Sequence, residues 1–118
     1  MNNQQITSAI TCTIKGVPYK GIIPKVGSGW GKSVGSDFYG GEITEVAEDL
    51  TWFKTDKEGY AKFDHRKNSI HYGKYVFAYP AENGKLKYEK TNHNFRCTRM
   101  NVCSVYEIPQ SDRLDPHF

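Results

Sequence analysis

Residues 25–34, KVGSGWGKSV, have the composition of a phosphate-binding loop, because glycines alternate with small polar residues before a Lys-Ser pair. A Walker loop needs a glycine five positions before Gly31, but Val26 stands there. That loop must also run into a helix, whose N-terminal N–H groups hold the phosphate. The residues that follow, VGSDFYGG, form helix poorly. The spacing therefore argues against a nucleotide hydrolase of this type.

A weaker role in anion binding remains for the same segment. Successive glycines allow backbone N–H groups to converge on an anion. Lys32 adds a positive charge, Ser33 adds a hydroxyl donor, and Trp30 can stack on a base or a sugar. We therefore predict a glycine-rich loop over residues 27–36 that contacts a ligand. The alternative is a mobile connection in which Trp30 only covers the end of a barrel.

Basic residues with aromatic neighbours form a second pattern. Arginine forks onto phosphates and aromatic rings stack on bases, so this pattern indicates a surface for nucleotides or single strands. Basic side chains also fill the exposed face of any sheet, which is the alternative interpretation. The first group is His65, Arg66, Lys67 and His71, with Tyr60 and Tyr72 nearby, and the second is His93, Arg96 and Arg99, with Phe95 nearby.

The chain contains residue types that could perform catalysis, but their spacing does not pair them. Histidine and glutamate can act as acid and base on RNA, but no spacing here selects a pair. The histidines form no H-x-H or H-x-x-x-H pair for a metal. Cys12, Cys97 and Cys103 are odd in number and lack C-x-x-C spacing, which is typical of reduced, partly buried thiols. We predict no catalytic residue, no metal site and no cofactor.

Short strands must position these candidates. Period-two alternation over residues 6–14, followed by VPYKGIIP, predicts an N-terminal hairpin within residues 1–25. The Asn83-Gly84 pair between two aromatic runs is a strong hairpin signal. A short helix in GEITEVAEDL is the alternative to a strand through Ile43 and Val46, but β-branched residues and glycines favour the strand. Other strands are expected at residues 50–55, 60–63, 74–80, 85–90 and 101–108.

Turn signals about every ten residues predict an all-β domain, a small antiparallel barrel or sandwich of SH3-like or OB-like form, with at most one short helix. We expect one domain over residues 1–118, ending in a polar tail at 109–118. A formal net charge of +3 permits an anionic partner without demanding one. The chain shows no signal peptide or membrane span, so we expect a soluble, cytoplasmic protein without membrane contact.

A large part of the chain resembles a loose family of small bacteriophage proteins. The resemblance runs from VGSGWGKSVGSDFYGGEITEVAEDLTWF through KYVFAYPAENGKLKYEK to the terminal DPHF, roughly residues 26–118. It implies a small non-structural phage protein in the cytoplasm of the host cell. Such proteins commonly bind a host enzyme, a defence complex or a signalling nucleotide. The matching positions are Gly27, Gly29, Ser36-Asp37, Ile43, Val46, Asn83-Gly84 and Asp115 to Phe118.

The leading hypothesis is a non-enzymatic phage protein that inhibits a host function, with defence as the expected target. It would block a host protein surface or sequester an anionic or nucleotide ligand. The alternatives are a module that binds single-stranded nucleic acid and a small enzyme that cleaves RNA or a nucleotide. The oligomeric state stays open. Because aromatic and arginine side chains dominate binding energy at interfaces, the expected contacts are Trp30, Lys32, Ser33, Tyr39, Arg66, Arg96 and Arg99.

Overall fold

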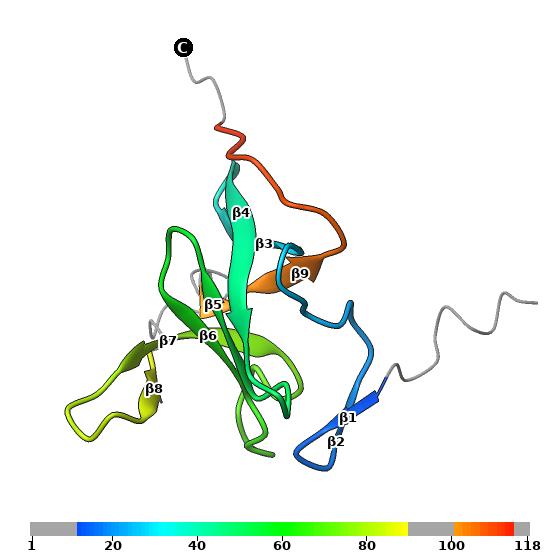
Figure 1. Ribbon diagram of the computed structural model, residues 1–118, viewed down its shortest axis with the longest axis vertical. Coiled ribbons are helices and arrows are strands. Elements are labelled where there is room, and N and C mark those ends of the chain that lie inside the picture. The colour runs from blue at the N-terminus through cyan, green and yellow to red at the C-terminus, as the bar shows by residue number, and fades with distance from the viewer. Residues whose placement is uncertain (1–11, 90–100, 115–118) are drawn as a thin grey trace, which may run out of the picture.

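A computed structural model describes residues 12–89 and 101–114, which form two antiparallel sheets (Figure 1). The small sheet is the hairpin of β1 (Cys12–Ile14) and β2 (Val17–Tyr19). The large sheet has seven strands in the order β8-β7-β6-β5-β4-β3-β9. Its strands are β3 (Gly29–Val34), β4 (Asp37–Val46), β5 (Trp52–Thr55), β6 (Tyr60–Phe63), β7 (Tyr75–Pro80), β8 (Leu86–Tyr88) and β9 (Ser104–Tyr106). The prediction of an all-β antiparallel fold is therefore confirmed.

The large sheet is not closed into a barrel, so the barrel, one of the two predicted forms, is not found. The segment before β9 meets β7 at an isolated bridge between Val76 and Val102. Beside it, the Cys103 N–H donates to the Tyr75 carbonyl at 2.9 Å. In the described part of the chain no ladder continues from this bridge.

Strand β3 replaces most of the glycine-rich loop predicted over residues 27–36, and that prediction is wrong. Period-two alternation puts Gly29 and Gly31 on one face, where other parts of the chain pass very close. A Cβ atom at Gly29 would collide with the Ile108 carbonyl, and one at Gly31 would collide with the Phe38 ring. These glycines therefore allow close packing within the sheet.

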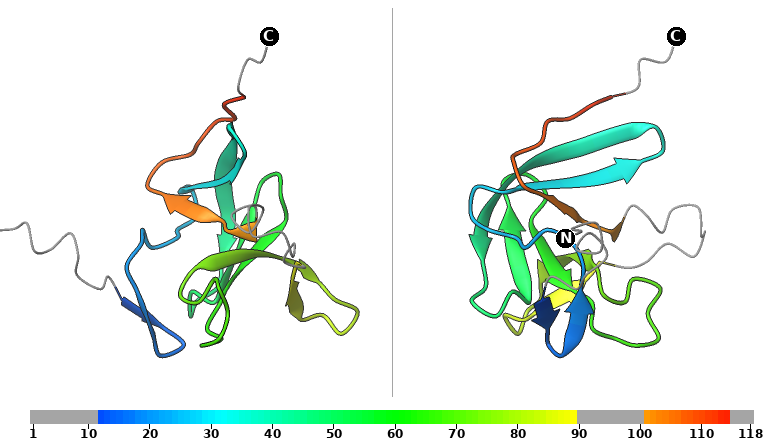
Figure 2. Two further views of the ribbon diagram at one scale, coloured as in Figure 1. Left: turned by 180° about the vertical axis from the view of Figure 1, so that it is seen from behind. Right: turned by 90° about the vertical axis from the view of Figure 1, so that its right-hand side faces the viewer.

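The C-terminal strap, residues 107–114, runs beside the β3–β4 hairpin (Figure 2). Phe38 and Arg113 exchange both backbone hydrogen bonds, at 2.8 and 2.7 Å. The Arg113 guanidinium also lies 4.1 Å from the centroid of the Phe38 ring. The Asp112 carboxylate accepts a hydrogen bond from the Gly40 N–H at 3.0 Å. The described part of the predicted polar tail is thus bonded to the sheet, and residues 115–118 lie outside the described residues.

Aromatic rings join the small sheet to the large one. Tyr19 on β2 packs edge-on against Phe63 and Tyr75, with ring centroids 6.0 and 5.6 Å apart. Phe53 lies against the same Tyr75 ring at 4.9 Å. The β1–β2 part of the predicted N-terminal hairpin is confirmed, and residues 1–11 lie outside the described residues. The core consists of Ile14, Val17, Tyr19, Trp30, Ile43, Phe53, Ala61, Phe63, Tyr75, Phe77 and Cys103.

The β7–β8 hairpin forms where Asn83-Gly84 predicts it. Gly84 adopts a φ of 81°, which explains the glycine there, and the Asn83 side-chain Oδ1 accepts the Lys85 N–H at 3.0 Å. Strand β4 covers residues 41–46 of the segment GEITEVAEDL, for which a short helix was the alternative, and ends at Val46. Within the described ranges, no helix has the length and apolar character needed to cross a membrane.

Candidate functional site

Two of the predicted binding residues are engaged inside the fold. Trp30 is fully buried, and its indole N–H donates to the Asp56 carboxylate at 2.8 Å. It is therefore a core side chain and has no surface to offer a base. The Lys32 ammonium pairs with the Glu58 carboxylate at 2.8 Å and lies 5.3 Å from the centroid of the Phe77 ring. Its charge is thus already balanced.

The other predicted residues of the β3–β4 hairpin do not complete a site. Register pairs Lys32 with Tyr39, and the Lys32 ammonium lies 5.9 Å from the centroid of that ring. Ser33 is exposed, but neighbouring residues of a strand point to opposite faces, so it turns away from Lys32. The structure therefore brings Lys32 and Tyr39 together and leaves Ser33 apart.

Arg66 is fixed by a buried carboxylate. Its Nε and Nη2 donate to the two Asp64 carboxylate oxygens, each at 2.9 Å, and its guanidinium lies 4.1 Å from the centroid of the Tyr88 ring. His71, expected in the same basic group, is buried. This group therefore does not form one continuous basic surface. Arg96 and Arg99, together with His93, lie outside the described residues.

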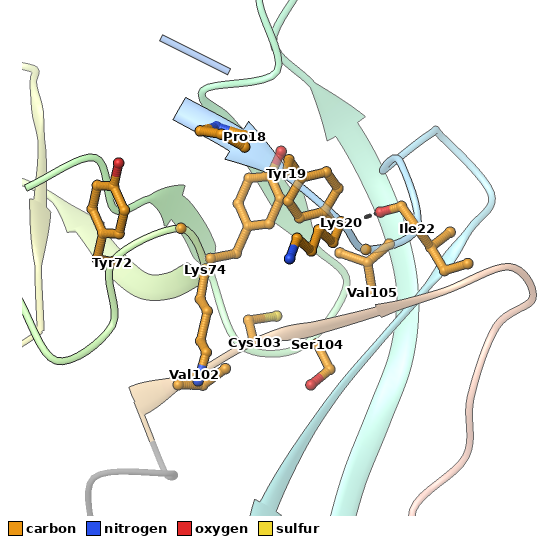
Figure 3. A pocket seen from close by; sticks show the side chains of 13 residues that line it. Pro18, Tyr19, Lys20, Ile22, Tyr72, Lys74, Val102, Cys103, Ser104 and Val105 are labelled. Carbon is orange, nitrogen blue, oxygen red and sulfur yellow. Dashed lines mark hydrogen bonds between the residues drawn. The ribbon is translucent and has the colours of Figure 1, made fainter. Parts of the chain in front are cut away.

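A cavity of about 870 Å³ opens between the small sheet, the turn before β7 and strand β9 (Figure 3). In that view Tyr72 and Ile22 stand at opposite sides, and Lys20 and Lys74 lie between them. Trp30, Lys32, Ser33, Tyr39 and Arg66, the predicted binding residues that the structure describes, do not line this cavity. Its lining residues are Pro18, Tyr19, Lys20, Gly21, Ile22, Tyr72, Gly73, Lys74, Tyr75, Val102, Cys103, Ser104 and Val105.

The cavity walls are largely apolar, and their tyrosine hydroxyls are already hydrogen-bonded. The Tyr19 hydroxyl donates to the Ile22 carbonyl at 2.5 Å, and the Tyr75 hydroxyl donates to the Leu50 carbonyl at 2.6 Å. Burial, more than any charged neighbour, raises the pKa of both phenols, so both are neutral at physiological pH. These rings therefore present apolar surface to a ligand.

The charge beside this apolar surface is positive. Lys20 and Lys74 are both exposed side chains of the cavity wall. Its described lining contains no aspartate, glutamate or histidine. Neither lysine forms a salt bridge with a carboxylate of the described residues. The cavity is thus suited to a ligand that combines an apolar or aromatic body with a negative group.

Cys103 is the cysteine of the described cavity wall. It is almost fully buried, and burial raises the pKa of its thiol. The thiol therefore stays protonated at neutral pH, whereas a nucleophilic cysteine acts as the thiolate. Elsewhere in the described ranges, no group of three or more His, Cys, Asp or Glu side chains could hold a metal ion.

Sequence reasoning missed this cavity because three distant segments build it. Lys20 follows Tyr19, and Lys74 precedes Tyr75, so each pair sets an inward ring beside an outward charge. Such Tyr-Lys neighbours occur on any half-buried strand. Only the folded chain shows that the two pairs and β9 border the same space.

Comparison with known proteins gives no match: no family model fits the chain, and no curated protein and no solved structure is similar to it.

Proposed function

We propose that this protein is a non-enzymatic binding protein that holds a small anionic ligand in the cavity. One observation carries the proposal: Lys20 and Lys74 stand beside apolar walls in a space whose described lining has no carboxylate. A negative group near these ammonium ions gains Coulomb energy, which grows as the ligand body excludes water. The apolar body of the ligand gains free energy by burial against Tyr19, Tyr75 and Val105.

A nucleotide has the required chemistry. Its base is a flat ring that can pack against tyrosine, and its phosphate can bind lysine. The volume of about 870 Å³ lies within the range of roughly 300–1,000 Å³ that small-molecule sites usually have. Nucleotides are therefore the first ligand class to test, ahead of other aromatic anions.

Resemblance to small phage proteins supports a biological setting for this activity. A phage protein in the host cytoplasm that sequesters a signalling nucleotide would deprive a host defence system of its signal. We therefore infer that inhibition of a host function, by removal of its ligand, is the role of the cavity. Blocking a host protein surface is the other form of the same inhibition and would not require the cavity.

The cavity supports binding without turnover. General acid–base chemistry needs a titratable group with a pKa near the working pH. The described lining offers lysines, neutral phenols and the protonated Cys103 thiol, and no carboxylate or imidazole. A bound nucleotide is therefore expected to leave the protein chemically unchanged.

A thermal-shift panel of mononucleotides and cyclic dinucleotides tests this proposal. At a ligand concentration of about 100 Kd, binding adds about 2.7 kcal/mol to stability, which raises Tm by roughly 10 °C in a domain of this size. Mass spectrometry of the recovered ligand should show the intact nucleotide. A cleaved product would replace the binding protein with the enzyme alternative.

Matched variants connect any shift to the cavity. The double variant Lys20→Gln/Lys74→Gln should lose most of the Tm rise, and Ile22→Ala should weaken it. Lys25→Gln and Ile70→Ala change an exposed lysine and an exposed isoleucine outside the cavity lining, so they should preserve it. If no member of the panel shifts Tm, the nucleotide form of the proposal fails.

A second candidate function, binding of single-stranded nucleic acid, is favoured by a different surface. The outer face of β5, β6 and β8 carries aromatic and lysine side chains, and it shares no residue with the cavity lining.

A further inference from the structure

The outer face of β5, β6 and β8 carries aromatic rings and lysines in alternation. Strand pairing sets Trp52 opposite Lys62 and Lys54 opposite Tyr60. Paired residues of antiparallel strands point to the same face, so these four side chains are neighbours. Tyr88 joins the same row through Ala78 of β7. We call the set Trp52, Lys54, Tyr60, Lys62, Leu86 and Tyr88 the lysine–aromatic face.

Contacts within the lysine–aromatic face keep its rings and charges close together. The Lys62 ammonium lies 4.8 Å from the centroid of the Tyr88 ring, and the Lys54 ammonium lies 5.7 Å from that of Tyr60. Trp52 and Tyr60 meet edge-on, with centroids 5.7 Å apart. These five side chains are partly exposed, and the Arg66 guanidinium also lies 4.1 Å from the centroid of the Tyr88 ring. A partner can therefore reach only the surface of Tyr88 that these cations leave open.

Two hollows lie next to each other on this face. One, of about 410 Å³, is lined by Trp52 and Tyr60, and the other, of about 290 Å³, is lined by Tyr88. The residues common to both hollows are Lys62, Lys85 and Leu86. Each hollow therefore offers an aromatic wall, and lysines stand where the two hollows meet.

The lysines at this junction lack negative partners. No carboxylate of the described residues forms a salt bridge with Lys62 or Lys85, and neither hollow has an acidic residue in its described lining. Burial lowers the pKa of Lys62, and the nearby charges of Lys15, Arg66 and Lys85 lower it further, whereas the Asp64 carboxylate opposes them. A phosphate at this junction would relieve the repulsion among these cations.

We propose that the lysine–aromatic face binds single-stranded nucleic acid and takes two successive nucleotides. One base packs against Trp52 in the larger hollow, and the next packs against Tyr88 in the smaller one. The phosphate that links them lies over Lys62 and Lys85. A single strand is required, because the base faces of a duplex are covered by stacking and cannot reach aromatic side chains. This site is separate from the cavity and does not depend on its function.

Fluorescence anisotropy of a labelled oligo(dT) of about twelve nucleotides tests the proposal on the full chain. Binding should weaken as salt rises, with a log–log slope of about −0.7 for each neutralised phosphate. Oligo(dT) should also quench Trp52 emission, which is separable from that of the fully buried Trp30. A duplex of the same length should bind at least tenfold more weakly.

Variants assign the binding to this face. Lys62→Gln/Lys85→Gln should reduce the affinity about tenfold or more and flatten the salt slope, whereas Lys20→Gln/Lys74→Gln, with equal loss of charge, should change neither. Trp52→Ala should cost about tenfold, in the range of single base stacks, and Trp52→Phe should restore most of it. Circular dichroism verifies that each variant is folded. Absence of binding at low salt, equal affinity for duplex, or equal effects of the two lysine pairs would overturn the proposal.

Discussion

Asp64 accepts hydrogen bonds from residues of the loop between β6 and β7. It is fully buried, and it accepts hydrogen bonds from the Arg66 backbone N–H, the Arg66 guanidinium and the Ser69 hydroxyl. Burial by itself raises the pKa of this carboxyl, but the hydrogen bonds from Arg66 and Ser69 outweigh it and bring the pKa to about 2. Arg66 is therefore held for the fold, which explains why it is a poor candidate for gripping a ligand.

Replacing this carboxylate should cost stability in a pH-dependent way. Because the folded pKa lies below the ordinary value of 3.8, the contribution is present above about pH 4 and is lost as pH falls toward 2. We expect Asp64→Asn to lower the free energy of unfolding by about 2 kcal/mol at neutral pH. Urea unfolding between pH 7 and pH 3 measures this. The exposed control Glu48→Gln should have little effect, and a difference from wild type that stays constant down to pH 3 would contradict the assignment.

His71 should make the protein sensitive to mild acid. Its side chain is buried, its Nε2 has no hydrogen-bond partner among the residues that the structure describes, and burial lowers its pKa below 6.5. Asp64 works against this shift, whereas Lys74 and Arg66 add to it. The unfolded chain then takes up a proton first, so stability falls as pH drops below about 6.5. In His71→Phe, part of the stability difference between pH 7.5 and pH 5.5 should disappear. An unchanged difference would exclude His71 as its source.

The glycines of strand β3 allow close packing in the sheet. Gly29 and Gly31 resemble the glycines of a flexible anion-binding loop when only the sequence is read. In the sheet they are the positions where the Ile108 backbone and the Phe38 ring pass too close for any side chain. Glycine composition does not separate these two uses, since the approaching groups come from elsewhere in the chain.

A methyl group on this face of β3 should therefore be destabilising. Gly29→Ala places a Cβ against the Ile108 carbonyl, and overpacking of this kind costs about 1–3 kcal/mol. Ser33→Ala, on the same strand but exposed, should change the free energy of unfolding by less than about 0.5 kcal/mol. Thermal or urea unfolding compares the two. Equal effects would indicate that the strap does not press on β3.

Local signals predict the elements of this fold better than its site. Asn83-Gly84 gives the β7–β8 hairpin correctly, because turn conformations depend on adjacent residues. Lys32 hydrogen-bonds to Glu58, and Trp30 hydrogen-bonds to Asp56; each partner lies 26 positions away in the sequence. No local pattern reveals such partners, so residues predicted to bind a ligand prove to be engaged within the fold.

The large sheet curls, so that β9 comes back toward β7. The small sheet packs against β7 through Tyr19, whose ring meets that of Tyr75 edge-on. The cavity is the space left where these three parts meet, and Lys20 and Lys74 reach it from different segments. Binding a ligand there would tie the small sheet to the large one. We therefore expect the lysine charges and the apolar walls of this cavity to act together on one ligand.

A titration with two matched fluorescent probes tests whether charge and apolar surface act together in the cavity. Anilinonaphthalene sulfonate combines an aromatic body with one negative charge, and N-phenylnaphthylamine has nearly the same body without it. Wild type should bind the anionic probe at a stoichiometry of one and at least tenfold more tightly than the neutral probe. Lys20→Gln/Lys74→Gln should retain the neutral probe and lose the preference for the anion. Two results would contradict the proposed role of Lys20 and Lys74 in the cavity. One is equal affinity of wild type for both probes, and the other is a preference for the anionic probe that survives in the double variant.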